Sequence, residues 1–124
     1  MRKIDIKNLN YLIKNDYLRP KVEQIIEMNN IQNLDKMYNE CQLLLEFITG
    51  CLLAKKFNMK IEKLDLIKII EKCNDLDNNL AQEMMSINAE YNIINEPTIN
   101  DIEFLLDSIE SIYGYIIEKY GEII

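Results

Sequence analysis

The sequence contains no histidine and no tryptophan, and it has only three glycines, two prolines and three cysteines among 124 residues. Without histidine the chain lacks the commonest general base and the Glu-x-x-His ligand pairs of di-iron bundles, which also excludes haem and typical zinc catalysis. The glycines, at positions 50, 114 and 121, form no GxGxxG or GxxxxGK[ST] phosphate loop. So few glycines and prolines favour long helices joined by short turns.

The cysteines Cys41, Cys51 and Cys73 are odd in number and have no CxxC spacing, so neither structural zinc nor a disulfide framework is expected. On a shared helix Cys41 and Cys51 would lie about 15 Å apart, too far for a disulfide. None of the three has an evident base beside it that could make the thiolate available. We therefore expect buried free thiols in a reducing cytosol, no metal and no cofactor.

The charge balance is acidic, with a formal net charge of -7 and a pI near 4.6, and it disfavours nucleic acid as a general partner. The candidate phosphate contacts are Lys55, Lys56 and Lys60, although lysines at this point also complement a helix C-terminus. The first residues contain no signal-peptide core, and the longest apolar stretch, 43–54, is too short to cross a bilayer. These features predict a cytoplasmic protein that does not use a membrane.

Apolar residues at alternating steps of four and three predict helices over 31–57 and 75–94 and a third that begins after Thr98. Thr98 with Asp101 approximates a capping box, and Gly121 is a natural stop. A shorter helix is expected over 63–72, with Leu64, Ile67 and Ile70 facing the core. Two more are expected over 8–14 and from Pro20. We predict an all-α antiparallel up-and-down bundle of four to six helices in one domain, 1–124, with 1–30 as an N-terminal helical extension and 31–121 as the bundle core.

The longest predicted helix has an apolar stripe wider than one neighbour covers, because Leu44, Phe47 and Cys51 broaden it. This width fits either a central position in the bundle or a dimer contact, and we predict a homodimer, in which Gly50 and Ala54 would allow close packing. Tyr115 lies off the main stripe of the last helix and indicates an exposed aromatic contact. Three acidic residues at helical spacing in the last helix, Glu103, Asp107 and Glu110, are expected on a solvated face. Asp75 and Asp77 flank the start of the 75–94 helix, where acids complement the helix dipole.

One segment resembles a known family. The run from Ile87 to Pro97, INAEYNIINEP, followed by an amphipathic helix, is similar to the LNxxYxxxRYP pattern of HEPN proteins, and the leucine-rich stretches around Leu52 and Leu64 resemble that family's long and short helices. The resemblance would cover about Leu34 to Tyr120. Active members cut RNA without metal through an Arg and a His in an RX4-6H arrangement. Here Asn95 stands in the place of that Arg and no His follows, so the resemblance implies a chain without nuclease activity.

What the resemblance implies instead is a non-catalytic protein-interaction or substrate-binding subunit. HEPN proteins form dimeric bundles that bind a partner, often a small nucleotidyltransferase, as in a toxin–antitoxin pair, or hold a substrate in the dimer cleft. The residues carried over as cleft contacts are Tyr91, Asn92 and Asn95, and Tyr115 is a further candidate partner contact because of its place on the last helix. Two alternatives stay open: an RNase or nucleotide-modifying enzyme acting through Lys55, Tyr91 and Asn95, and an unrelated helical structural or regulatory adaptor.

Overall fold

In the computed structural model, the described residues are 9–28, 33–58, 66–93 and 96–124, with 91–93 described by their backbone alone; they form six helices and no strand. This confirms the all-α prediction. The helices are α1 (Tyr11–Lys14), α2 (Leu18–Glu27), α3 (Leu34–Phe57), α4 (Leu66–Leu76), α5 (Asn78–Ile93) and α6 (Ile99–Tyr120).

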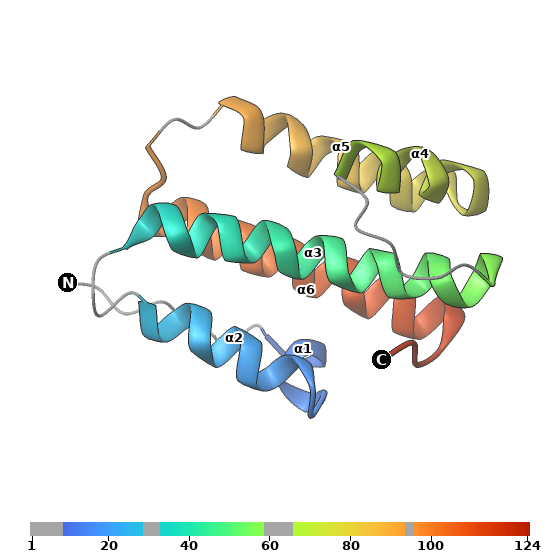
Figure 1. The fold of residues 1–124 in the computed structure, drawn as a ribbon, viewed down its shortest axis with the longest axis horizontal. Coiled ribbons are helices and arrows are strands. Elements are labelled where there is room, and N and C mark those ends of the chain that lie inside the picture. The colour runs from blue at the N-terminus through green and yellow to red at the C-terminus, as the bar shows by residue number, and fades with distance from the viewer. Residues whose placement is uncertain (1–8, 29–32, 59–65, 94–95) are drawn as a thin grey trace.

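The helices lie in three layers (Figure 1). In the middle layer α3 and α6, the two longest, pack side by side and run in the same direction. The α4–α5 pair covers one side of this layer, and α1 with α2 covers the other. Consecutive helices reverse direction at α2–α3, at α4–α5 and at α5–α6, so these pairs are antiparallel as predicted, whereas the central pair α3 and α6 is parallel.

The core is one continuous cluster of apolar side chains to which every helix contributes. The α3 stripe enters it as expected, since Tyr38, Cys41, Leu45, Ile48 and Leu52 are all buried. Leu12, Leu18, Val22 and Ile25 from the N-terminal helices belong to the same cluster. Residues 9–28 therefore help to build the core rather than lie beside it.

The ends of α6 follow local sequence signals. The Thr98 hydroxyl accepts a hydrogen bond from the Asp101 amide at 3.3 Å, and the Asp101 carboxylate accepts one from the Thr98 amide at 2.8 Å. The predicted capping box is therefore confirmed. At the other end the helix stops at Gly121, whose φ of 82° is a conformation that glycine adopts without strain.

The corner between α4 and α5 differs from the prediction. α4 continues to Leu76, four residues beyond the expected end, and α5 begins at Asn78 rather than Asp75. Asp77 is the reason, because its carboxylate accepts a hydrogen bond from the Leu80 amide at 3.2 Å and so fixes the first turn of α5.

The buried face of α4 also differs in part from the prediction. Ile67 was expected to be buried but is 60% exposed, whereas Ile70 is buried as expected. The buried stripe of α4 consists of Leu66, Ile69, Ile70 and Cys73, and Ile67 lies outside it. Leu64 lies outside the described residues.

The starts of the first two helices are shifted from their predicted positions. α1 covers only the last four residues of the predicted 8–14 helix, and α2 begins at Leu18, so Pro20 is its third residue rather than its first. None of the helices described in the structure is long and apolar enough to cross a membrane.

Candidate functional site

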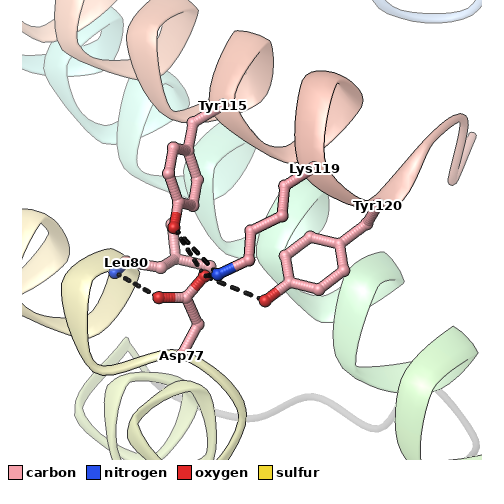
Figure 2. Close-up of polar contacts among 5 residues, drawn as sticks. All are labelled: Asp77, Leu80, Tyr115, Lys119 and Tyr120. Atoms are coloured by element: carbon pink, nitrogen blue, oxygen red, sulfur yellow. Dashed lines mark hydrogen bonds and ion pairs between the residues drawn. The ribbon is translucent and has the colours of Figure 1, made fainter.

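A cluster of polar side chains joins the α4–α5 corner to the end of α6 (Figure 2). Oδ2 of Asp77 accepts hydrogen bonds from the Tyr115 hydroxyl at 2.7 Å, the Lys119 ammonium at 2.9 Å and the Tyr120 hydroxyl at 2.9 Å. Oδ1 accepts the Leu80 amide. The Asp77 side chain is 2% exposed and that of Lys119 is 50% exposed, so a buried carboxylate pairs with a cation at the surface.

The ionisation of Asp77 reflects two opposing effects. Burial, the largest single effect, raises the pKa of the carboxyl group, but the hydrogen bonds from Lys119, Tyr115, Tyr120 and the Leu80 amide together outweigh it. The pKa of Asp77 therefore lies well below its ordinary value, and the group is a carboxylate at neutral pH. Because both carboxylate oxygens of Asp77 accept hydrogen bonds from donors of the same chain, the cluster holds the helices together.

The position of Tyr115 corrects the prediction of an exposed aromatic contact. The residue is partly buried, and its hydroxyl is held by Asp77 while Lys119 Nζ lies 5.6 Å from its ring centroid. The acids Asp75 and Asp77 were grouped together from the sequence, but Asp75 is exposed and Asp77 is buried. The sequence contains no signal for this difference, since the three side chains that donate to Asp77 come from a helix 38 or more residues away.

Glu110 is a second buried carboxylate, and the expectation of a solvated face is wrong for it. Its Oε2 accepts the Asn10 amide at 3.0 Å and its Oε1 accepts the Leu12 amide at 3.0 Å, while the Tyr11 amide also donates to it. These amides are the first of α1, which a four-residue helix leaves without partners of its own. Glu110 therefore anchors α1 to α6.

Gly114 lies beneath the ring of Tyr11. A Cβ atom at this glycine would come within 2.9 Å of two ring carbons. The ring is held in place because the Tyr11 hydroxyl donates to Glu118, one turn further along α6. The glycine thus allows α1 to pack closely against α6.

Two of the three lysines predicted as phosphate contacts have partners within the chain. The Lys55 ammonium donates to the backbone carbonyl of Glu122 at 2.6 Å, and the Lys56 ammonium lies 5.0 Å from the ring centroid of Tyr120. Both belong to the last turn of α3, where cations complement the helix dipole. Lys60 lies outside the described residues.

The predicted cleft residues are placed only in part. Tyr91 and Asn92 belong to the last turn of α5, and only their backbone is described; Asn95 lies outside the described residues. The prediction that these three side chains form cleft contacts therefore lies outside the described residues.

The thiols are buried as expected. Burial raises the pKa of Cys41 and of Cys73 to about 12, and the neighbouring Glu40 and Asp77 carboxylates add to the effect. Burial also raises the pKa of Cys51. Such thiols carry almost no thiolate at neutral pH and are poor nucleophiles.

The predicted dimer residues Gly50 and Ala54 are half-buried on α3. The breadth of the α3 stripe, from which a dimer was predicted, is used within one chain, because α3 packs against α2, α4 and α6. This packing accounts for the breadth of the stripe without a second copy of the chain.

An apolar surface that the sequence did not reveal lies where α2 meets α3. Tyr17 and Leu43 are each 52% exposed, and the Tyr17 ring stacks on Phe47 with centroids 5.3 Å apart. Lys21 Nζ lies 5.1 Å from the Tyr17 centroid and 5.8 Å from that of Phe47. Beside them is a groove of about 250 Å³, lined by Lys21, Gln24, Ile25, Glu40, Leu43, Leu44 and Phe47. We call the surface formed by Tyr17, Lys21, Glu40, Leu43 and Phe47 the α2–α3 face.

The α2–α3 face is the strongest candidate for a functional site, because large apolar side chains beside charged ones are typical of protein contacts. The sequence pointed to only one of its members, Phe47, as a residue that widens the α3 stripe. Within the described ranges, no group of three or more Cys, Asp or Glu side chains is arranged to hold a metal ion.

Comparison with known proteins identifies no relative: no family model, no curated protein and no solved structure matches this chain.

Proposed function

We propose that this chain is a non-catalytic, HEPN-like interaction subunit that works as a homodimer and binds a protein partner such as a small nucleotidyltransferase. The observation that carries the homodimer is the α2–α3 face, where Tyr17 and Leu43 remain half exposed beside a groove. A helical domain that leaves large apolar groups open beside charged ones has a surface suited to association.

The reactive groups support binding rather than catalysis. The Asp77 carboxylate and the amides around Glu110 form contacts inside the chain, and the thiols of Cys41 and Cys73 have a pKa of about 12. A general acid or base works best with a pKa near the working pH, whereas the pKa of Asp77 is lowered and the pKa values of Cys41 and Cys73 are raised, in each case away from neutrality. The sequence also contains no histidine that could take this role.

The short helix α4 between α3 and α5 supports a HEPN-like chain over an unrelated adaptor, because the resemblance implies a short helix at this place. The replacement of the family's Arg by Asn95 supports a subunit without nuclease activity, since an amide cannot supply the cationic two-point phosphate contact of a guanidinium group.

RNA incubation tests the non-catalytic assignment. The purified chain, incubated with RNA in the presence and in the absence of divalent metal, is expected to release no more fragments than buffer does. Asn95→Ala is the matched variant. Cleavage by the wild type that this variant loses would establish the enzyme alternative and overturn our proposal.

The partner is tested by titration calorimetry between the purified chain and a small nucleotidyltransferase encoded by a neighbouring gene. We expect saturable binding. If such an enzyme does not bind while the chain still lacks turnover, the partner class is wrong and the interaction role needs another partner.

A further inference from the structure

We propose that a second copy of this chain docks on the α2–α3 face, related to the first by a twofold axis that passes beside Leu43. This inference rests on the homodimer of the proposed function and assigns its contact surface.

The charges of the α2–α3 face lie at its two ends. Glu40 and Phe47 are seven residues apart on α3, which separates them by about 10 Å along the helix axis, with Leu43 between them. The Lys21 ammonium lies over the Phe47 ring, 5.8 Å from its centroid. The face therefore has a cation at the Phe47 end, an anion at the Glu40 end and an exposed leucine in the middle.

A twofold axis makes this surface complementary to itself. In such an interface the same patch is used by both copies, so a contact between two positions occurs twice. Rotation about an axis beside Leu43 brings the two leucines together and places the Lys21 ammonium of one copy near the Glu40 carboxylate of the other. The result is an apolar centre with two ion pairs at its rim, an arrangement common in protein interfaces.

The charge pattern disfavours uniformly charged occupants of the α2–α3 face. A uniformly basic partner would meet Lys21, and a uniformly acidic partner would meet Glu40, so each would place like charges together. A second copy of the face carries both signs at this spacing with an apolar residue between them, so it avoids like-charge contacts. The net charge of -7 opposes association at long range, but physiological salt screens charges beyond about 8 Å.

Lys21 would keep its present contacts in the dimer. Its ammonium already lies 5.1 Å from the Tyr17 centroid, on the ring pair that forms one wall of the face. A carboxylate arriving from the other copy would pair with a cation that is already positioned, which reduces the ordering cost of association.

Sedimentation velocity of the full chain at micromolar concentration and physiological salt tests this assignment. We expect a dimer for the wild type. Leu43→Glu should raise the dimer dissociation constant by roughly a hundredfold, because two carboxylates then meet at the axis. Ile67→Glu, at a 60% exposed position on α4 outside the α2–α3 face, is the matched control and should leave the dimer unchanged.

A charge exchange tests the orientation of the two copies. Lys21→Glu and Glu40→Lys should each weaken the dimer by roughly tenfold, and the double variant, whose net charge equals that of the wild type, should restore it. Circular dichroism confirms that each variant is folded.

The outcomes separate this inference from the proposed function. A wild-type dimer that Leu43→Glu leaves intact would overturn the α2–α3 face and leave the homodimer standing. A dimer that Leu43→Glu breaks, but that the double variant does not restore, would overturn the twofold orientation. A monomeric wild type that still binds the nucleotidyltransferase would overturn the dimer while the interaction role remains.

Discussion

The hydroxyl of Tyr115 donates a 2.7 Å hydrogen bond to Oδ2 of Asp77, and this bond joins the corner between α4 and α5 to the last turns of α6. Lys119 and Tyr120 donate to the same oxygen. One carboxylate thus caps a helix and holds two layers of the bundle together.

Replacement of Asp77 by asparagine should separate these two roles. Asparagine caps a helix about as well as aspartate does, so α5 keeps its start, but the charge that pairs with Lys119 is lost. We expect the free energy of unfolding to fall by about 1–3 kcal/mol, as for a hydrogen bond to a charged group that is removed. Denaturant unfolding followed by circular dichroism measures the change.

The matched control for this variant is Asp75→Asn, two residues earlier on the exposed side of α4. An exposed substitution of this kind should change stability by no more than about 0.5 kcal/mol. Equal stabilities of the two variants would show that the Asp77 cluster adds nothing beyond the cap.

The stability of the chain should depend on acid pH through Asp77. The pKa of this group is lower in the folded chain than its ordinary value of about 3.9 in an unfolded chain. The unfolded state therefore takes up the proton first as the pH falls, and the stabilisation, present in full above about pH 5, declines below about pH 4. The difference in unfolding free energy between wild type and Asp77→Asn, measured from pH 6 to pH 3, should shrink with falling pH. A constant difference would contradict the depressed pKa.

Features encoded by neighbouring residues were predictable from the sequence. The capping box of α6 uses Thr98 and Asp101, three residues apart, and the α3 stripe from Tyr38 to Leu52 repeats with the helical period. Such patterns depend on the geometry of one helix. They correctly predicted an all-α fold and the buried stripe of α3.

Features that depend on which helices meet were not predictable. Glu110 was grouped with exposed acids, but it is buried because α1, about 100 residues earlier, docks on its side of α6. The α2–α3 face likewise needs Tyr17 and Phe47 to be brought together from different helices. An acidic or aromatic residue at helical spacing indicates a face, and only the topology decides what covers that face.

The anchoring role of Glu110 predicts a local effect. Glu110→Ala should leave the amides of Asn10, Tyr11 and Leu12 without their acceptor and should lower the free energy of unfolding by about 1–3 kcal/mol. Hydrogen exchange should accelerate in α1 more than in α5, because the contact is confined to the former. Ser111→Ala, at the next and exposed position of α6, is the control and should preserve slow exchange in α1.

The contact between Gly114 and Tyr11 predicts that the effect of Gly114→Ala on the free energy of unfolding changes sign when Tyr11 is replaced by alanine. In an open helix, alanine is more stable than glycine by about 1 kcal/mol. In the wild type, however, the new Cβ would lie 2.9 Å from two ring carbons of Tyr11, and overpacking of this kind costs about 1–3 kcal/mol. We therefore expect Gly114→Ala to destabilise the wild type and to stabilise a Tyr11→Ala background, because removal of the ring leaves only the helix preference. Thermal and denaturant unfolding of the four proteins measures the coupling between the two sites. Additive effects of the two substitutions would mean that the ring moves aside at no cost and that α1 is not fixed against α6 by this contact.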